Sequence, residues 1–232
     1  MIKTLAIIPA RAGSKRIPNK NVRDFLGKPL VTWTIEFATS YKNFDDVLVT
    51  TDSAAIANIA AVCGKPVPWL RPAELASDEA TTLDVVLHAL DCCEKDGQSY
   101  DYVALLQPTT PFRREKVWDL AKQKLDSGAP AAVGVSSLDY HPYWTYWLSE
   151  DDKMQPCYPG KSDLRSQNLP NAVTVNGSLY LVKVDVLRST RSFTPDGVCA
   201  VFVDDKFEAL DIDTELDWFV AEQLLSESGL MK

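Results

Sequence analysis

The chain has 232 residues, of which 46% are hydrophobic and 24% are charged, and this balance excludes a disordered or low-complexity protein. The formal net charge of −8 argues against general nucleic-acid binding. No apolar run is long enough to cross a bilayer and the N-terminus lacks the features of a signal peptide, so we expect a cytoplasmic protein.

Short apolar runs alternate with amphipathic segments through the first 136 residues. Runs bounded by turn residues predict buried strands, and apolar residues at helical spacing predict helices. We expect strands at 5–10, 47–51, 67–70, 102–107 and 131–136, and helices at 29–41, 53–62, 81–94 and 115–126. This alternation predicts an α/β fold with a mostly parallel sheet covered on both faces.

The pattern changes over residues 138–172, where aromatic residues crowd together and a turn-rich polar stretch follows. Such a connection is too long for a simple loop in a compact domain. We therefore expect either an inserted arm that contacts a second subunit or a lid. Strands at 178–182 and 199–203 and a helix at 214–225 then resume the α/β pattern, which predicts a single domain over residues 1–232.

A basic segment, Arg11–Asn21, directly follows the first expected strand. Its small residues would let backbone N–H groups approach a polyphosphate; these residues are Ala12, Gly13 and Ser14. Its cations could neutralise a nucleoside triphosphate and stabilise departing pyrophosphate; they include Arg11, Lys15 and Lys20. The segment matches neither the dinucleotide motif nor the Walker loop. A solvated basic turn is the alternative interpretation.

Asp211 and Asp213 lie two positions apart in an extended segment near the C-terminus. Carboxylates at this spacing project to one side and could share Mg²⁺, which prefers oxygen ligands and bridges phosphate groups. Alternatively, Asp213 caps the last helix, with Glu215 favourably placed in the first turn. The pairing of two aspartates favours the metal.

Two further loops contain candidate binding residues. Gln107 ends an expected buried strand before a stiff proline turn and could hold a sugar or a base. Arg71 lies in a loop after residues 67–70 and could meet an anion or a base. The alternatives are a turn whose prolines only set geometry and an ordinary surface arginine.

These motifs, taken in order, resemble the cytidylyltransferases that make CMP-activated acidic sugars, the acylneuraminate cytidylyltransferase family. The resemblance runs from Leu5 to about Leu225 and rests on Ala-Arg-x-x-Ser-Lys-x-x-Pro-x-Lys-Asn, Arg-Pro-Ala-Glu-Leu-Ala-Ser-Asp, Leu-Gln-Pro-Thr, Asn-Gly-x-Leu-Tyr and Asp-Ile-Asp-Thr-Glu. It implies a Rossmann-like nucleotidyltransferase core and a homodimer that exchanges an arm.

The resemblance also implies roles for individual residues. Those matching the family's CTP site are Arg11, Ala12, Gly13, Ser14, Lys15, Lys20, Asn21, Arg71 and Thr82. Those matching the sugar-acid site are Gln107, Arg165, Asn176, Tyr180 and Phe193, with Arg165 reaching the neighbouring subunit's site. Asp211 and Asp213 match the pair that binds Mg²⁺ or Mn²⁺.

The expected reaction is attack by the anomeric C2 hydroxyl of a nine-carbon sugar acid, N-acetylneuraminate first, on the α-phosphorus of CTP. Catalysis is assigned to Arg11, Lys15 and Lys20, with Lys20 nearest the transferring phosphorus. Where the family often has Arg-Pro before Asn-Gly, this chain has Thr174-Val175. Legionaminic acid, another nonulosonic acid or the eight-carbon KDO are alternative substrates. A non-catalytic nucleotide-binding regulator is the alternative from another class.

Overall fold

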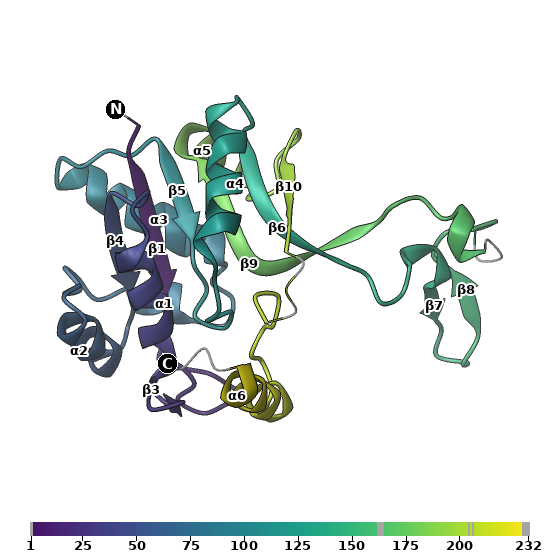
Figure 1. The fold of residues 1–232 in the computed structure, drawn as a ribbon, viewed down its shortest axis with the longest axis horizontal. Coiled ribbons are helices and arrows are strands. Elements are labelled where there is room, and N and C mark those ends of the chain that lie inside the picture. Colours follow the sequence, from purple (N-terminus) through teal and green to yellow (C-terminus); the bar gives the residue numbers. More distant parts are fainter. Residues whose placement is uncertain (1, 162–164, 204, 206, 229–232) are drawn as a thin grey trace.

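The computed structural model describes residues 2–161, 165–203, 205 and 207–228 (Figure 1). These residues form a central six-stranded sheet in the order β10-β6-β9-β5-β1-β4. Its strands are β1 (Thr4–Pro9), β4 (Asp46–Thr50), β5 (Tyr102–Leu105), β6 (Ala131–Ser137), β9 (Val173–Lys183) and β10 (Cys199–Phe202). Every paired neighbour is parallel except β9, which runs antiparallel to β5 and β6. The expected α/β fold with a mostly parallel sheet is confirmed.

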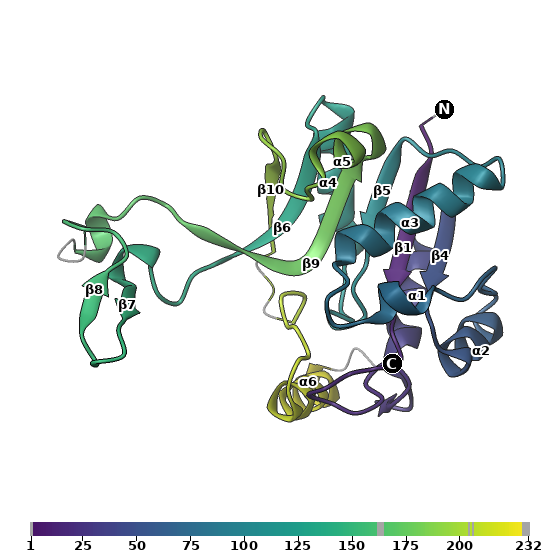
Figure 2. The same cartoon turned by 180° about the vertical axis from the view of Figure 1, so that it is seen from behind.

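Helices cover both faces of this sheet (Figures 1 and 2). They are α1 (Leu30–Ser40), α2 (Ala54–Val62), α3 (Thr82–Lys95), α4 (Glu115–Asp126), α5 (Val184–Thr190) and α6 (Glu215–Ser228). Side chains of β1 alternate between two cores: Ala6 and Ile8 pack with α1 and α4, whereas Leu5 and Ile7 pack with α3 and α5. This alternation follows from the two-residue period of a strand and buries an entirely apolar run. None of the described helices is long and apolar enough to cross a membrane.

Most expected elements appear within one or two residues of their predicted bounds, and α4 matches fully. The strand expected at 67–70 is wrong, because this stretch forms no strand. Pro66 and Pro68 both lack the N–H that a sheet ladder needs. Helix α5 was not predicted, and β9 begins five residues earlier than expected.

A third, smaller hydrophobic cluster joins the two ends of the chain. Ile17 and Phe25 pack there with Ile212 and Trp218, and all four side chains are buried. The Phe25 and Trp218 rings meet edge to face, with centroids 5.1 Å apart. Phe25 belongs to a short hairpin of β2 (Asp24–Phe25) and β3 (Lys28–Pro29). Because of this cluster, the basic N-terminal loop lies directly against the segment that contains Asp211 and Asp213.

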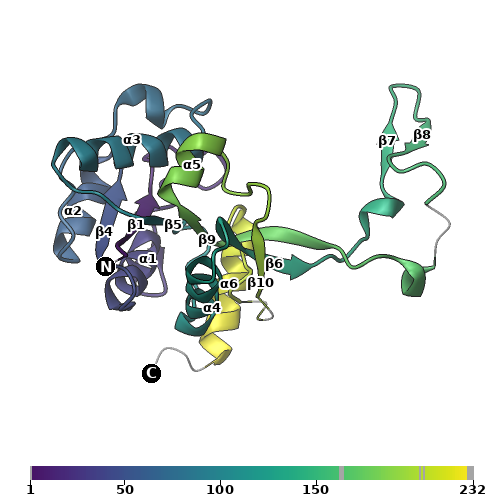
Figure 3. The ribbon, with the colours of Figure 1, turned by 90° about the horizontal axis from the view of Figure 1, so that it is seen from above.

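Residues 138–161 and 165–172 leave the body of the molecule between β6 and β9 and project far from it (Figures 1 and 3). The projecting end contains 3₁₀ turns at Pro142–Trp144 and Ser166–Asn168 and a two-stranded sheet, formed by β7 (Tyr146–Leu148) and β8 (Met154–Pro156). Its large apolar side chains include several that are exposed to solvent: Tyr140, Tyr146, Trp147, Leu148, Met154 and Tyr158.

Candidate active site

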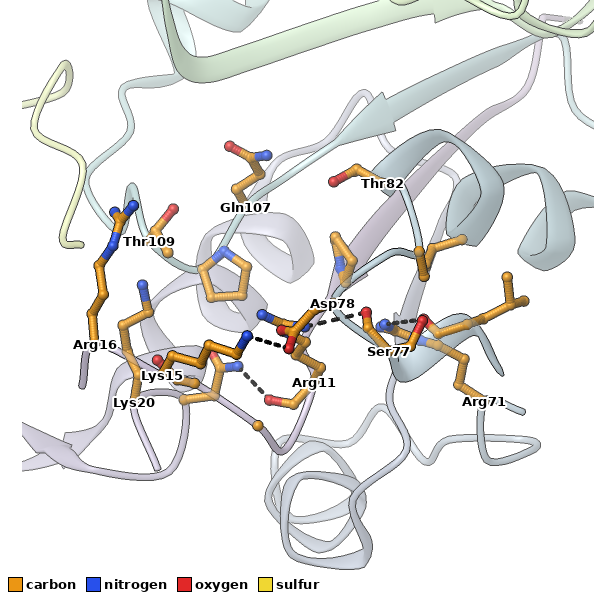
Figure 4. Close-up of a pocket in the computed structure, with 18 of the residues that line it drawn as sticks. Arg11, Lys15, Arg16, Lys20, Arg71, Ser77, Asp78, Thr82, Gln107 and Thr109 are labelled. Atoms are coloured by element: carbon orange, nitrogen blue, oxygen red, sulfur yellow. Dashed lines mark hydrogen bonds and ion pairs between the residues drawn. The ribbon is translucent and has the colours of Figure 1, made fainter. Parts of the chain in front are cut away.

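A cleft of about 480 Å³ opens at the carboxyl ends of β1 and β5 (Figure 4). This edge is where open α/β sheets place their ligands, and the volume suits a nucleotide-sized molecule. Its lining includes many of the residues expected from the sequence: Arg11, Gly13, Ser14, Lys15, Lys20, Asn21, Arg71, Thr82, Gln107 and Asp213. The structure thus gathers segments from positions 11 to 213 around one space.

Two cations of the first loop, Arg11 and Lys15, converge on one carboxylate in the cleft (Figure 4). Arg11 Nη1 lies 2.9 Å from Asp78 Oδ1, and Lys15 Nζ lies 2.6 Å from Asp78 Oδ2. Hydrogen bonds from Lys15 and then Arg11 hold the pKa of Asp78 below its ordinary value. Asp78 therefore provides the negative charge that these cations need when no anion is bound.

The loop that bears these cations is fastened at both ends. Asn21 Nδ2 donates to the carbonyl of Arg11 at 2.9 Å, which closes the loop on itself. The amide of Ala12 donates to Asp52 Oδ1 at 2.9 Å, so this N–H already has a partner. Gly13 is exposed, and an added Cβ would meet no atom within 4 Å. The backbone at Gly13 is accordingly open to a ligand approaching from the cleft.

Lys20 connects this loop to the C-terminal aspartates. It is buried, and its Nζ donates to the carbonyl of Ile212 at 2.8 Å and to Asp213 Oδ1 at 3.0 Å. Arg16 Nη1 donates to the other carboxylate oxygen of Asp213 at 2.8 Å. Asp213 thus carries two cationic partners from a loop almost two hundred residues away, and its side chain faces the cleft.

The helix-cap interpretation of Asp213 is not supported by the hydrogen bonds at the start of α6. Thr214 Oγ1 accepts from the amide of Asp217 at 3.2 Å, while Asp217 Oδ2 accepts from the amide of Thr214 at 2.7 Å. This reciprocal pair is a capping box built on Thr214. The side chain of Asp213 is consequently available for the cleft.

Asp211 lies beside Asp213 and accepts a hydrogen bond from the side chain of Thr109. The residue is solvent-exposed, yet neighbouring protein displaces enough water to raise its pKa, and the charge of Asp213 raises the pKa further. Two carboxylates two positions apart supply the oxygen ligands that a hard divalent cation prefers. Among the described residues no third potential ligand completes a cluster, so phosphate oxygens and water would fill the remaining positions.

Gln107 occupies the turn after β5, and both its main chain and its side chain are constrained. Its carbonyl accepts hydrogen bonds from Arg113 Nη2 at 2.6 Å and from Thr110 Oγ1 at 3.2 Å. Its Oε1 would lie 3.1 Å from a Cβ at Gly177, where φ is +77°. A side chain at position 177 would therefore be strained and would crowd the Gln107 amide.

Arg71 is buried, and its donors bond to main-chain carbonyls and to the hydroxyl of Thr50. Its guanidinium donates to the carbonyl of Thr50 and to that of Leu75, and its amide donates to Thr51. Desolvation lowers the pKa of Arg71. Thr82, the first residue of α3, lines the cleft on the same side (Figure 4). The roles of Arg71 and Thr82 toward a nucleotide stay predictions.

The residues expected to hold the sugar are not gathered as closely as those of the loop. The rings of Tyr180 and Phe193 pack with centroids 5.5 Å apart. Burial, and then the charge of Asp211, raises the pKa of Tyr180. Asn176 bonds within the sheet, donating to Ser136 Oγ at 2.8 Å and accepting from Ser178 Oγ at 2.7 Å. Arg165 is exposed in the projecting segment. Their contacts with a sugar stay predictions.

The residues of this site that were not identified from the sequence include Arg16, Asp78 and Thr109. Arg16 lies inside the basic motif, so its charge was visible but its partner was not. Asp78 closes the Arg-Pro-Ala-Glu-Leu-Ala-Ser-Asp motif and could have been proposed as a counter-ion. Thr109 follows Gln107 by two positions, which places it on the same turn.

Comparison with known proteins decides the family. A family model described as cytidylyltransferase matches residues 5–141, more than half of the chain. The chain belongs to the cytidylyltransferase family. The resemblance inferred from the ordered motifs is thereby confirmed.

Relatives extend the likeness of this cytidylyltransferase to its full length. It is 33% identical over 225 residues to a CMP-N,N'-diacetyllegionaminic acid synthase of Legionella pneumophila, with 97% of each chain covered. It is 32% identical over 218 residues to a pseudaminic acid cytidylyltransferase of Campylobacter jejuni, with 93% of each covered. A shorter match of 46% identity covers 48% of this chain and 25% of an N-acylneuraminate cytidylyltransferase of Escherichia coli.

Solved structures share the fold. A CMP:2-keto-3-deoxy-manno-octonic acid synthetase complexed with CTP superposes with a TM-score of 0.72 at 18% identity, covering 97% of this chain and 99% of the other. The 4-diphosphocytidyl-2C-methyl-D-erythritol synthase of Anaerococcus prevotii has a TM-score of 0.65 at 12% identity, covering 97% of both chains. At these identities the likeness concerns the fold alone.

Proposed function

We propose that this cytidylyltransferase transfers CMP from CTP to the anomeric C2 hydroxyl of a nine-carbon nonulosonic acid and releases pyrophosphate. The observation that carries the proposal is the convergence of a cationic loop and Asp213, with Asp211 two positions before it, at one cleft. Lys20 joins them directly, through Asp213. A loop alone would suffice to bind a nucleotide, whereas the adjoining carboxylate pair favours chemistry on its phosphates.

In the proposed step the C2 oxygen forms a bond to the α-phosphorus while the bond from that phosphorus to the β-phosphate bridging oxygen breaks. Arg11 and Lys15 leave Asp78 and neutralise the triphosphate, and they stabilise the charge that accumulates on departing pyrophosphate. Lys20 stands nearest the aspartates and supports the transferring phosphoryl group. The proton of the sugar hydroxyl is released to solvent.

Asp211 and Asp213 would hold Mg²⁺, or Mn²⁺, because both ions accept an oxygen-only ligand set. When bound, such an ion neutralises phosphate oxygens and acidifies a hydroxyl near it. Neither histidine is placed to act as general base: His88 lies within α3, and His141 lies in the projecting segment. An ion held by Asp211 and Asp213 would instead supply the acidification of the attacking hydroxyl.

The sugar acid would bind between Gln107 and the aromatic pair of Tyr180 and Phe193. An amide and two ring faces suit a molecule that has hydroxyl groups on one side and an N-acyl group on the other. We propose N-acetylneuraminate as the first substrate. A diacetamido acid, legionaminic or pseudaminic, is the second, because the relatives named for those acids match nearly the whole chain.

A direct comparison of substrates tests this choice. The enzyme, CTP and Mg²⁺ would be incubated with N-acetylneuraminate, N,N'-diacetyllegionaminate, pseudaminate and KDO in turn, and kcat/KM would be obtained from CMP-sugar formation. The proposal predicts the highest kcat/KM for one of the nine-carbon acids. Turnover confined to KDO would contradict it.

We also propose that the projecting segment, residues 138–172, contacts a second copy of the chain. Its exposed aromatic side chains supply the apolar surface that an obligate interface buries. Arg165 would then reach the sugar carboxylate in the partner's cleft.

A further inference from the structure

Arg113 lies on the turn between β5 and α4, and its guanidinium folds back under the cleft. Nη2 donates to the carbonyl of Gln107 at 2.6 Å and to Thr110 Oγ1 at 3.1 Å. Nη1 donates to Thr34 Oγ1, on α1, at 3.0 Å. One planar side chain thus ties the end of the central strand, the turn after it and a neighbouring helix together.

Placing the Arg113 guanidinium here costs the folded protein desolvation free energy. All three acceptors are uncharged oxygens, and Nε is sealed from solvent without a hydrogen-bond partner among the described residues. Burial lowers the pKa of Arg113 to about 9. A buried cation without a paired carboxylate costs more than an apolar side chain of similar size. The charge of Glu208 and the ring of Phe37, whose centroid lies 6.0 Å from the guanidinium carbon, offset only part of this cost, since the pKa stays lowered; stability alone is therefore a weak reason for an arginine here.

The turn that Arg113 holds supports two parts of the cleft. Gln107, whose carbonyl it fixes, points its amide toward Gly177 and the proposed sugar position. Two residues on, the carbonyl of Thr109 accepts from the amide of Ile212 at 2.8 Å, and its side chain bonds to Asp211. A shift of this turn would move the Gln107 amide and the aspartate segment together.

We propose that Arg113 is a positioning residue for the acceptor sugar, acting through the main-chain carbonyl of Gln107. This inference rests on the proposed function, in which Gln107 contacts the sugar acid. The planar fork suits the task because it can hold two acceptors on one side and a third on the other, which a lysine ammonium cannot do with the same geometry.

Arg113→Lys keeps the charge and removes the fork. We expect the KM for the sugar acid to rise about tenfold while the KM for CTP changes by less than about twofold. Arg113→Met should raise the sugar KM further. Arg114→Gln is the matched control, because Arg114 is an exposed neighbour that pairs with Asp205 and Glu208, and it should leave both KM values unchanged.

Thr34→Val tests the same link without touching the arginine, since Thr34 anchors Nη1 from α1, away from the cleft lining. We expect a sugar KM raised about threefold, and an effect smaller than additive when it is combined with Arg113→Lys.

If Arg113 had only a structural role, its replacement would reduce the amount of active enzyme, and kcat would fall with both KM values unchanged. That result would overturn the inference. A sugar KM within about twofold of wild type in Arg113→Lys would overturn it as well. Wild-type enzyme that transfers CMP to none of the acids refutes the proposed function and this inference together. Normal wild-type kinetics with an unaltered sugar KM in the variant refutes the inference alone.

Discussion

Asp78 forms the two ion pairs that a bound triphosphate would have to replace. Its carboxylate meets Arg11 and Lys15 at the open edge of the cleft, and all three side chains retain solvent exposure. Exposed pairs of this kind are weak, so a polyanion can displace them. Asp78 holds Arg11 and Lys15 in place when the cleft is empty. Its negative charge would repel the phosphate groups that replace it beside these cations.

Replacement of Asp78 by Asn should therefore tighten CTP binding. We expect a dissociation constant lowered about three- to tenfold, since the competing carboxylate is removed while its shape is kept. Isothermal titration calorimetry with CTP, in the absence of sugar acid, measures the change. Glu79→Gln removes the neighbouring exposed acid as a control and should have a smaller effect. Weaker binding by Asp78→Asn would show that Asp78 organises the cations more than it opposes the ligand.

The raised pKa of Asp211 predicts a particular pH dependence. The ionised carboxylate binds the divalent cation, so activity should rise with pH through a limb that lies above the ordinary aspartate value of about 3.9. Because protons and Mg²⁺ compete for the same oxygens, a higher Mg²⁺ concentration should move this limb to lower pH. Profiles of kcat/KM at two Mg²⁺ concentrations provide the measurement. A limb that does not move with Mg²⁺ would separate Asp211 from metal binding.

At the scale of elements, helix α6 and the hairpin of β2 and β3 pack against the basic loop that contains Lys20. Ile17 in the loop is fully buried among Phe25, Ile212 and Trp218. The packing fixes the distance between Lys20 and Asp213, which belong to opposite ends of the chain. The geometry of the site thus depends on a hydrophobic cluster outside it.

Ile17→Ala should destabilise the protein by about 2–4 kcal/mol, because a cavity would remain in this cluster. CTP affinity should fall as well, because the basic loop would lose the packing contact that holds it against the cluster. Leu216→Ala is the control: Leu216 is 69% exposed on α6, and its loss should change the free energy of unfolding by less than about 0.5 kcal/mol. Denaturant unfolding of both variants compares them. Equal stabilities would mean that the loop does not depend on this cluster.

The elements themselves could be predicted from the sequence because their causes are local. The apolar run of β1, the helical spacing in α4 and the cap of α2 on Ser53 each depend on residues within a few positions. The partners of the site were beyond such reasoning. Arg16 meets Asp213 across 197 positions and Arg11 meets Asp78 across 67, and only the tertiary fold brings them together.

The sequence left the roles of Asp213 and Arg71 open, and particular hydrogen bonds in the structure bear on both. The capping box on Thr214 leaves the side chain of Asp213 for the cleft. The guanidinium of Arg71 donates hydrogen bonds to the carbonyls of Thr50 and Leu75, so these donors hold the loop and not a ligand. The sequence alone marked Asp213 and Arg71 as candidate site residues. Their hydrogen-bond partners in the structure distinguish a structural role from a ligand-binding one.

For the whole molecule, the projecting segment is the main feature that the central fold does not explain. It places Trp147 at 67% and Leu148 at 69% exposure, far from the α/β body. Apolar side chains on an isolated arm favour association because water is displaced when they are covered. A two-fold pair of chains that exchange these arms would cover both and would bring Arg165 to the other cleft.

Trp147→Glu should convert a dimer into a monomer in sedimentation velocity experiments, because a charge would be buried in the interface. Val62→Glu, at a position 89% exposed on α2, is the control and should leave the mass unchanged. A monomeric wild-type protein would contradict the exchange of arms.

Mixing two inactive variants tests whether the arm acts in trans. Arg165→Ala lacks the arm cation and Lys20→Ala lacks the loop cation, so only a mixed dimer has one intact cleft. Equal mixing should recover about a quarter of wild-type activity if subunits exchange freely. No recovery, with mixed dimers demonstrated by mass, would place Arg165 outside the partner's site.

The central claim is that the cationic loop and the aspartate pair together perform CMP transfer to a sugar acid. The most direct measurement follows pyrophosphate and CMP-sugar at the same time in reactions of the enzyme with CTP, Mg²⁺ and a nine-carbon acid. We expect one pyrophosphate per CMP-sugar, no pyrophosphate without the acid, and loss of both products in Asp211→Asn. Stable CTP binding with no CMP-sugar from any of the acids would contradict it and favour a nucleotide-binding regulator.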